Sequence, residues 1–341
     1  MTKVLVTGAS GYIAKHIVLQ LLQAGYEVRA SVRSQQRTDQ IRSAIESHIN
    51  ADIDLERVLT FVELDLNSDN GWSQALSGVD VLMHTASPFP SKSPDDESEL
   101  IRPAVDGTLR ALKAAAQNEV KRVILTSSTA SVVYGEGPET GKPFDESHWT
   151  DTDHPGCSTY SKSKTLAEKA AWDFVANNAK DINLTCINPG FVFGPPLDEN
   201  FGTSMEVIAR LIRGKDPAIP RLGFACVDVR DVATAHIRAI DLPDTYGKRI
   251  LAVSGFLWFQ DIAAAVKTAY PRRRIATRLA PDWLIKFLGL FDKQIRGIVP
   301  LLGLQFQVSN QRARNLLGME FIDPRESAVE SARFLIDRKL H

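Results

Sequence analysis

The chain has 341 residues, of which 44% are hydrophobic and 24% charged, values typical of a soluble globular protein with a sizeable core. A formal net charge of −1 gives no electrostatic case for binding nucleic acid or an anionic membrane, and three widely spaced cysteines predict reduced thiols with neither a disulfide framework nor a metal site. No stretch reaches about 18 uncharged apolar residues, and the chain opens on a predicted strand, so we expect a cytoplasmic protein without a leader peptide or membrane span.

The first predicted strand, 3–8, leads into a turn of small residues and then a helical pattern over 12–24. Gly8 lets the chain reverse without a Cβ clash, and Gly11 lets a pyrophosphate approach bare backbone near free N–H groups and the positive end of a helix dipole. A glycine-rich hairpin is the alternative, but the pattern that follows is helical and not alternating. The spacing Gly8-x-x-Gly11-x-x-Ala14 resembles the short-chain dehydrogenase/reductase superfamily. The candidate cofactor contacts here are Gly8, Ser10, Gly11, Tyr12 and Ile13.

Apolar runs then alternate with helical patterns through the first half of the chain. The predicted strands are 3–8, 27–33, 58–64, 80–86, 122–128 and 182–188. The predicted helices are 12–24, 36–48, 70–77, 97–118, 160–179 and 205–213. This alternation predicts an α/β fold with a Rossmann-type, doubly wound parallel sheet, whose ligands bind at the carboxyl ends of the strands.

The end of strand 27–33 is where the residue type selects between the two nicotinamide cofactors. An acidic residue there would accept hydrogen bonds from the ribose 2′-hydroxyl of NAD, whereas Arg33 would pair with the 2′-phosphate of NADP. Arg37 would add a second charge, and no Asp or Glu occurs between Glu27 and Asp39. The alternative is a pair of solvated arginines on a loop.

The next two strands also end in candidate cofactor contacts. These are Asp65, Leu66, Thr85, Ala86 and Ser87. The Asp65 carboxylate would accept a hydrogen bond from the adenine amino group, although a helix N-cap explains this residue equally well. The small residues at the end of strand 80–86 would let the backbone approach the ribose and nicotinamide. His84 is predicted to be a packed strand histidine and not a base.

Strand 122–128 ends at Ser128, and a long polar stretch over 135–156 separates it from the next helical pattern. Loops of this length within compact domains are usually functional covers or disordered. The following helix begins at Tyr160, so Tyr160 and Lys164 share one face, four residues apart. A Tyr-x-x-x-Lys pair alone is common by chance, and the alternative explanation is an exposed helix pair.

These residue types suit carbonyl reduction. A tyrosine is a poor acid or base near neutrality, with an unperturbed pKa of about 10, and a nearby ammonium favours the phenolate and lowers that pKa. Tyr160 would protonate a carbonyl oxygen while hydride from a reduced nicotinamide reaches the carbon. Ser128 would hydrogen-bond the same oxygen, and Lys164 would also hold the ribose hydroxyls of the cofactor.

These motifs occur in a consistent order along the chain. In this order, the chain resembles an extended short-chain dehydrogenase/reductase, in the branch of dihydroflavonol reductases, cinnamoyl-CoA reductases and yeast-type methylglyoxal/aldehyde reductases. The matching motifs are the glycine turn, Ala-Ser-Val-Arg at 30–33, His-Thr-Ala-Ser-Pro at 84–88, Leu-Thr-Ser-Ser at 125–128, the Tyr160/Lys164 pair with Leu-Ala-Glu-Lys-Ala-Ala-Trp after it, Asn-Pro-Gly-Phe-Val-Phe-Gly-Pro at 188–195 and Asp-Val-Arg-Asp-Val-Ala at 228–233. The match covers most of the chain and fades after about residue 270.

The resemblance implies roles for individual residues. The implied catalytic triad is Ser128, Tyr160 and Lys164. Pro189 and Val192 would flank the nicotinamide, and Ser204 would touch the pyrophosphate. The arginines after the second strand match the residues that the family uses for the 2′-phosphate.

The chain departs from the family pattern at two positions. Asp106 stands where many relatives carry Asn, which leaves a proton relay through this position open. In plant dihydroflavonol reductases an Asn five residues after the catalytic serine binds the flavonoid hydroxyls, and here that position is Val133. An apolar residue cannot recognise a catechol, so we expect a substrate other than a flavonoid.

The second half is predicted to complete the core and to form a smaller C-terminal substrate-binding domain. Arg230 and Asp231 are expected to form structural ion pairs, and the basic run 272–274 to be solvated. An apolar helical segment over 283–306 is predicted to be the core of the small domain, with the lining of a hydrophobic substrate cleft as the alternative. Two closing helices are expected at 310–317 and 324–335. The expected boundaries are 1–190 and a returning segment at about 225–260 for the NADP-binding domain, and 191–224 and 261–341 for the substrate-binding domain.

These features predict a metal-free, NADPH-dependent reductase of aldehydes and ketones with hydrophobic substituents, reversible as an alcohol dehydrogenase. We expect a monomer or homodimer whose partner is a small-molecule carbonyl substrate. A sugar-nucleotide epimerase or dehydratase is the close alternative, but such enzymes usually keep NAD tightly bound and carry an acidic residue near position 33. A hydroxysteroid dehydrogenase is a second alternative. A cofactor-sensing regulator without turnover is a third, but such proteins often lose the tyrosine that this chain keeps.

Overall fold

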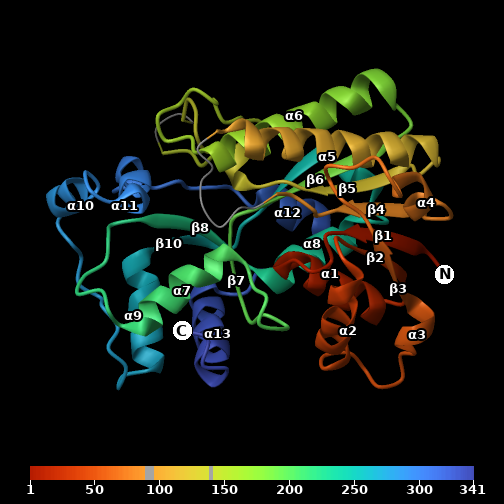
Figure 1. The fold of residues 1–341 in the computed structure, drawn as a ribbon. Coiled ribbons are helices and arrows are strands. Elements are labelled where there is room, and N and C mark those ends of the chain that lie inside the picture. The colour runs from red at the N-terminus through yellow and green to blue at the C-terminus, as the bar shows by residue number, and fades with distance from the viewer. Residues whose placement is uncertain (89–95, 138–140) are drawn as a thin grey trace.

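The computed structural model of the protein describes residues 1–88, 96–137 and 141–341, drawn as a ribbon in Figure 1. Its main element is a seven-stranded sheet in the order β3-β2-β1-β4-β5-β6-β9, in which all neighbouring strands are parallel. The strands are β1 (Lys3–Thr7), β2 (Glu27–Val32), β3 (Leu59–Glu63), β4 (Val81–His84), β5 (Arg122–Thr126), β6 (Asn183–Pro189) and β9 (Lys248–Ala252). The order reverses at β1 and β4, which is the point where such sheets bind ligands. The predicted doubly wound parallel sheet is confirmed.

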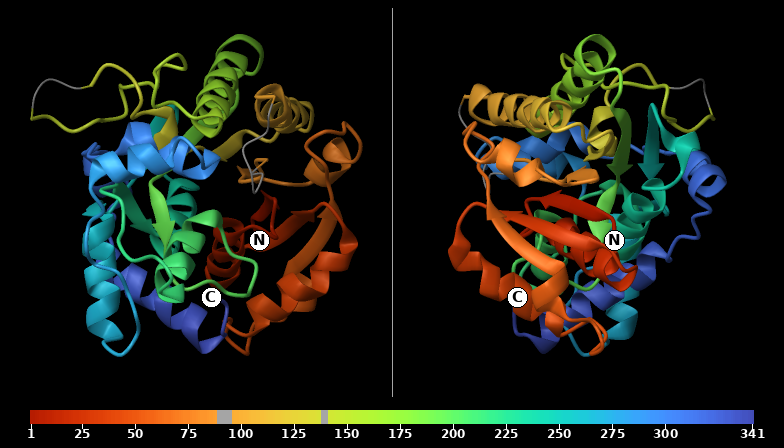
Figure 2. Two further views of the ribbon diagram at one scale, coloured as in Figure 1. Left: turned by 60° about the vertical axis from the view of Figure 1, so that its left-hand side comes forward. Right: turned by 90° about the vertical axis from the view of Figure 1, so that its right-hand side faces the viewer.

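Helices cover both faces of this sheet, as Figures 1 and 2 show. One face carries α1 (Tyr12–Gln23), α2 (Thr38–Glu46), α3 (Leu55–Val58), α8 (Val229–Ala239) and α12 (Gln311–Leu317). The other face carries α4 (Trp72–Leu76), α5 (Ser98–Gln117) and α6 (Thr159–Asn178). Because both faces are covered, the central strands are continuous apolar runs, such as Val4, Leu5 and Val6, which are completely buried.

A smaller sheet lies beside the first and is built from the second half of the chain. Its order is β10-β8-β7, with β7 parallel and β10 antiparallel to β8. Its strands and neighbouring helices are β7 (Phe191–Phe193), β8 (Gly223–Asp228), β10 (Gly255–Trp258), α7 (Thr203–Arg213), α9 (Phe259–Ala269), α10 (Asp282–Leu288), α11 (Lys293–Ile298) and α13 (Pro324–Asp337). Four short 3-10 helices complete the described elements: η1 (Gln35–Arg37), η2 (Thr129–Ser131), η3 (Pro243–Thr245) and η4 (Val299–Leu301).

The two closing helices that the sequence predicts are both present, but they pack on different units. α12 lies against β9 and α8, where Ala313 and Leu317 enter the core of the large sheet. α13 lies against α7 and α9, where Ala328 and Ala332 enter the core of the smaller unit. The end of the chain therefore joins the two parts of the fold.

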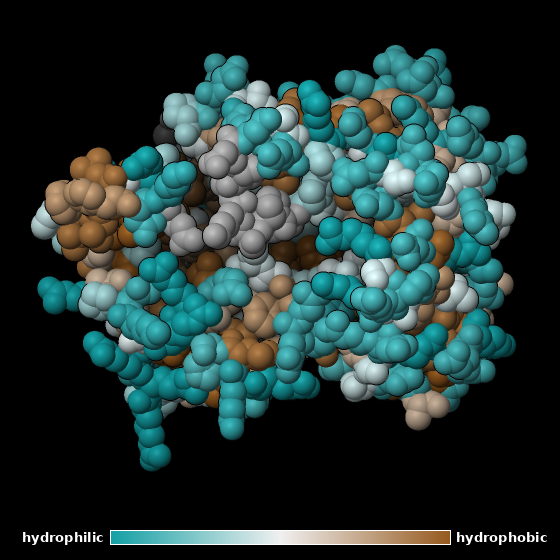
Figure 3. All heavy atoms as spheres, in the orientation of Figure 1, coloured by the Kyte–Doolittle hydropathy of each residue, from teal (hydrophilic) through white to brown (hydrophobic). Residues whose placement is uncertain are grey.

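The apolar segment that begins at Trp283 is not the core of the small unit that its pattern predicted. Trp283, Phe287 and Phe291 are 69%, 52% and 77% exposed. Leu288 and Leu290 are exposed with them, and the resulting apolar patch is visible at the left of Figure 3, where α10 lies in Figure 1. Helical periodicity identifies an apolar face but not what covers it, and the described part of the chain leaves this face uncovered.

Gly190 joins the two sheets, because it lies between β6 and β7. A Cβ at this position would collide with the backbone carbonyl oxygen of Ala225 on β8, which cannot move aside as a flexible side chain can. We expect Gly190→Ala to lower the free energy of unfolding by about 3 kcal/mol, measured by chemical denaturation. Gly255→Ala is the matched control, since no atom lies within 4 Å of its Cβ position. An equal decrease in the free energy of unfolding of both variants would contradict this explanation.

Candidate active site

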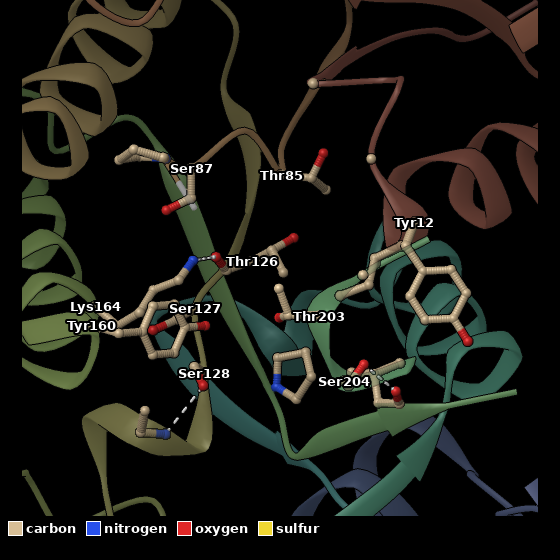
Figure 4. Close-up of a pocket in the computed structure, with 18 of the residues that line it drawn as sticks. Tyr12, Thr85, Ser87, Thr126, Ser127, Ser128, Tyr160, Lys164, Thr203 and Ser204 are labelled. Atoms are coloured by element: carbon tan, nitrogen blue, oxygen red, sulfur yellow. Dashed lines mark hydrogen bonds between the residues drawn. The ribbon is translucent and has the colours of Figure 1, made fainter. Parts of the chain in front are cut away.

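A cleft of ≈ 1170 Å³ follows the carboxyl ends of the strands of the large sheet and continues to the smaller sheet. It begins at the turn after β1 and reaches the first turn of α6, β8 and η4. Figure 4 shows part of its lining. Every residue that the sequence predicted to contact the cofactor or to act in catalysis lies in this lining.

The glycine turn is held in place by β2. Gly8 has a positive φ of 68°, and its N–H donates to the Ser31 hydroxyl at 3.0 Å. The N–H of Ala9 donates to the Ser31 carbonyl at 2.8 Å, so both hydrogen bonds fix the turn to one residue of the neighbouring strand. Gly11 precedes α1, and no side chain caps this helix. The first N–H groups of α1 therefore face the cleft, which suits an anion.

Tyr12 belongs to the cleft lining, but its ring turns away from the other lining residues. The Tyr12 hydroxyl donates to the carbonyl of Gly194 at 2.6 Å, and burial raises the pKa of this phenol. Figure 4 shows the hydroxyl pointing out of the cavity. Ser204 is also engaged within the protein, because its hydroxyl donates to the carbonyl of Val192 at 2.6 Å.

The sequence analysis missed a buried lysine beside the glycine turn. Lys15 on α1 is 1% exposed, forms an ion pair with Asp198 and donates to the carbonyl of Asn200 at 2.9 Å. The Asn200 side chain in turn donates to the carbonyl of Ser10 at 2.8 Å. Through these contacts, the segment after β7 packs against the glycine turn and the start of α1. A lysine in an amphipathic helix ordinarily faces solvent, so only the structure reveals this contact.

Arg33 and Arg37 follow β2 and are exposed at the end of the cleft nearest the glycine turn. Across from them, the Asp65 carboxylate accepts the N–H of Asn67 at 2.8 Å. The alternative explanation of Asp65 as a helix N-cap is wrong, because α4 begins at Trp72 and Gly71 is its N-cap residue. Asp65 closes a local turn and remains exposed in the cleft lining.

His84 is a packed strand residue, as predicted. Its Nδ1 hydrogen-bonds the hydroxyl of Thr7 at 2.9 Å, and its ring packs edge-on against Trp72. Burial lowers the pKa of His84 to about 3, so the ring is neutral at physiological pH. β4 ends here because the N–H groups of Thr85 and Ala86 both donate to the Thr7 hydroxyl oxygen, each at 3.1 Å.

Ser128, Tyr160 and Lys164 lie on one wall of the cleft (Figure 4). Ser128 follows β5 and caps η2, accepting the N–H of Ala130 at 3.1 Å. Tyr160 is half-buried in the first turn of α6. The Lys164 ammonium is buried one turn further, donates to the carbonyl of Thr126 at 3.4 Å and lies 6.0 Å from the centre of the Tyr160 ring.

The electrostatics of this pair differ from the sequence-based expectation. Burial raises the pKa of Tyr160, and a hydrogen bond with Ser128 opposes that rise, so the phenol is protonated at neutral pH. Burial lowers the pKa of Lys164 to about 8, while the charge of Glu168 raises it. The predicted lowering of the tyrosine pKa by the ammonium is therefore wrong for this structure, in which burial raises that pKa.

The far end of the cleft is apolar and is lined by segments distant in sequence. Its lining residues are Val133, Tyr134, Leu222, Phe224, Ile298, Leu301 and Phe306. The rings of Tyr134 and Phe306 meet edge-on at 5.4 Å. The alternative that part of the segment after residue 283 lines a hydrophobic cleft is therefore correct for its second half, whereas Phe287 and Phe291 lie on the exposed patch.

Other charged residues of the second half are structural. Arg230 forms ion pairs with Asp228 and Glu330, as predicted, whereas the Asp231 carboxylate accepts the N–H of Ile322 at 2.8 Å. Among residues 1–88, 96–137 and 141–341, no group of three or more His, Cys, Asp and Glu side chains is arranged to hold a metal ion. None of the described helices combines the length and apolar character needed to cross a bilayer.

Comparisons with known proteins agree with this geometry. The model of the NAD dependent epimerase/dehydratase family matches residues 4–253. Cinnamoyl-CoA reductase CAD2 of Medicago truncatula is 35% identical over 340 residues, covering 98% of this chain and 96% of that protein. Ketoreductase azaE of Aspergillus niger is 35% identical over 341 residues, covering 94% of each chain.

A solved structure is similar over the whole length. Yeast methylglyoxal/isovaleraldehyde reductase Gre2, crystallised with NADPH, superposes with a TM-score of 0.82 at 28% identity, covering 99% of each chain. Together with the family match, this shows that the chain belongs to the NAD dependent epimerase/dehydratase family of extended short-chain dehydrogenases/reductases, in the branch of cinnamoyl-CoA and methylglyoxal reductases.

Proposed function

We propose that this chain is an NADPH-dependent reductase that converts aldehydes and ketones with hydrophobic substituents into alcohols, reversibly. The observation that carries the proposal is the grouping of Ser128, Tyr160 and Lys164 on the wall of a cleft that ends in two arginines. Relatives named as a cinnamoyl-CoA reductase, a ketoreductase and an NADPH-dependent methylglyoxal reductase support the same class of reaction.

The residues of the cleft fit a phosphorylated dinucleotide. The uncapped N-terminus of α1 would bind the pyrophosphate, with Ser204 on the opposite side. Arg33 and Arg37, which form no ion pair within the described part of the chain, would bind the 2′-phosphate. Further proposed contacts are Gly8, Ser10, Tyr12 and Ile13 near the phosphates, Asp65 and Leu66 near the adenine, and Thr85, Ala86, Ser87, Lys164, Pro189 and Val192 near the ribose and nicotinamide.

The catalytic roles follow from protonation and position. When bound, NADPH supplies the hydride for the carbonyl carbon. Tyr160 donates its phenolic proton to the carbonyl oxygen, and burial favours this role because it keeps the phenol protonated at neutral pH. The Ser128 hydroxyl hydrogen-bonds the same oxygen and stabilises its developing charge. The Lys164 ammonium stabilises the phenolate that remains after proton transfer.

The apolar end of the cleft supports a substrate with hydrophobic substituents. Leu222, Ile298 and Phe306 would contact the substituents of the carbonyl, and Val133 offers no hydrogen bond to a catechol. We therefore propose that residues 1–190 with 225–260 bind the cofactor, with Val192 and Ser204 added from the second unit, and that 191–224 with 261–341 form the substrate-binding unit. The partner of this site is a small-molecule carbonyl compound.

The test is the absorbance of NADPH in the presence of the purified chain and a panel of aldehydes, ketones and diketones. We expect consumption of NADPH with carbonyls that carry branched or aromatic substituents, and slower consumption with short polar carbonyls. Failure of every carbonyl on the panel would overturn the proposal. Conversion of a sugar nucleotide with bound NAD would then favour an epimerase, and cofactor binding without turnover would favour a sensor.

The pKa of Lys164 sets an expected pH dependence. A lysine with a pKa lowered to about 8 is charged at pH 7 and loses its proton as the pH rises through that value. Without the ammonium the phenolate product is less stable, so we expect kcat for reduction to fall above about pH 8. The measurement is kcat at saturating NADPH and substrate between pH 6 and pH 10. A flat profile over this range would contradict the role of Lys164.

A further inference from the structure

A buried ion pair lies directly behind the wall that carries Ser128 and Lys164. Glu168 on α6 is 1% exposed and Arg249 on β9 is 6% exposed. Their Oε1 and Nε atoms are 2.6 Å apart, and a second contact joins Oε2 and Nη2 at 3.3 Å. Two charges removed from water are stable only when further hydrogen bonds satisfy them, and the partners of this pair lead to the active-site wall.

The carboxylate of Glu168 holds the turn that presents Ser128. Its Oε2 accepts the hydroxyl of Ser127 at 2.6 Å and the side-chain N–H of Asn188 at 2.8 Å. The hydroxyl of Ser131 lies 2.7 Å from the same oxygen and 2.8 Å from the carbonyl oxygen of Ser128. The residues before and after Ser128 are therefore both bound to one carboxylate, which limits how far the Ser128 hydroxyl can move.

Arg249 extends this network to the polar stretch that follows the turn. Its Nη1 donates to the carbonyl of His148 at 2.6 Å and to that of Glu146 at 3.2 Å. Its guanidinium stacks over Trp149 at 3.7 Å from the ring centre. The neighbouring Phe144 packs against Phe306 of the apolar lining. The ion pair thus contacts both the turn that carries Ser128 and the polar stretch that includes Phe144.

Glu168 also shares a helix face with Lys164, because four residues separate them on α6. Within the part of the chain that the structure describes, the other titratable groups around Lys164 offer no equivalent anion. His84 on β4 is neutral, Tyr160 is a protonated phenol, and Arg249 lies beyond the carboxylate. Glu99 on α5 lies in the cleft lining and not behind the lysine. Glu168 is therefore the buried anion on the protein side of Lys164.

We propose that Glu168 is a positioning residue for the reduction, fixing the 127–131 turn that carries Ser128 and placing a negative charge one helical turn behind Lys164. This inference rests on the proposed function for its kinetic part, whereas the effect on the Lys164 ammonium is independent of any reaction. Glu168 lies in a motif that contributes to the family resemblance, but the sequence pattern assigns no role to this residue.

The test compares Glu168→Gln with Asp228→Asn, a matched control. Asp228 is equally buried and is paired with Arg230 at 2.8 Å, outside the cleft lining. We expect both variants to lose thermal stability, and only Glu168→Gln to lower kcat, by about 10²-fold. Trace acetylation at a series of pH values, read by peptide mass spectrometry against Lys162, should show the midpoint of Lys164 at lower pH in Glu168→Gln alone.

Ser131→Ala separates the two parts of the proposal and covers the case in which Glu168→Gln does not fold. It removes the Ser131 link between the carboxylate and the Ser128 turn, while the Ser127 link and the contact between Glu168 and Arg249 remain, so we expect a lower kcat with an unchanged Lys164 midpoint. Wild-type kcat in Ser131→Ala, or a wild-type midpoint in folded Glu168→Gln, would overturn the proposal. Wild-type protein that reduces no carbonyl would instead refute the proposed function, and the acetylation result would still stand.

Discussion

Tyr160→Phe is expected to retain NADPH binding and to lose carbonyl reduction by about 10³-fold, the range of general acid catalysis. The variant removes one oxygen atom from a half-buried ring at the start of α6 and leaves its packing intact. Neither Lys164 nor His84 is placed to replace the phenol. Lys164 lies 6.0 Å from the ring centre and donates to Thr126, and the ring of His84 is neutral and bonded to Thr7.

The measurement has two readouts, because a loss of activity alone does not identify a proton donor. NADPH affinity, read from the fluorescence of the bound cofactor, should stay within a few-fold of wild type, while kcat falls with little change in KM. Tyr26→Phe is the control, since it deletes a phenolic hydroxyl that donates to Asp241 at 2.9 Å on the surface. Wild-type kcat in Tyr160→Phe would show that Tyr160 is not the proton donor.

The parts of the fold that the sequence predicts are those decided within a few neighbouring residues. The strand, turn and helix around Gly8 and Gly11 follow from an apolar run, two glycines and a helical period, and the structure has them as predicted. Tyr160 and Lys164 share a wall because four residues span one turn of helix. Parallel strands align their carboxyl ends, which explains why predicted contacts from separate strands line one cleft.

The features that the sequence does not predict depend on contacts between distant segments. Lys15 is buried because Asp198 and Asn200 reach it from the segment after β7, and no local pattern marks that approach. Arg249 meets Glu168 only after β9 has joined the large sheet beside β6. Burial of a helix face also depends on a partner, so the aromatic face of α10 has a core-like pattern but remains exposed.

In the proposed function, the preference between NADPH and NADH would be decided by charge, at the opposite end of the cleft from the reacting centre. The glycine turn and the N-terminus of α1 serve NAD and NADP equally, because both carry the pyrophosphate. The distinction would depend on the residues after β2, where Arg33 and Arg37 are exposed, and on the adjoining Asp65 carboxylate in the cleft lining. Asp65 follows β3 and is engaged by the N–H of Asn67.

Arg33→Asp is therefore expected to reverse the preference from NADPH to NADH. A hydrogen bond to a charged group contributes about 1.5–3 kcal/mol, so loss of the Arg33 contact should lower kcat/KM for NADPH by about 10–100-fold, and repulsion between carboxylate and 2′-phosphate adds to that loss. The new carboxylate would accept hydrogen bonds from the ribose hydroxyls of NADH and raise kcat/KM for that cofactor.

Arg57→Asp is the control, because Arg57 is exposed and lies outside the cleft lining. It makes the same change in net charge and should leave the ratio of kcat/KM for NADPH to kcat/KM for NADH unaltered. A wild-type ratio of kcat/KM values in Arg33→Asp would show that the 2′-phosphate is bound elsewhere.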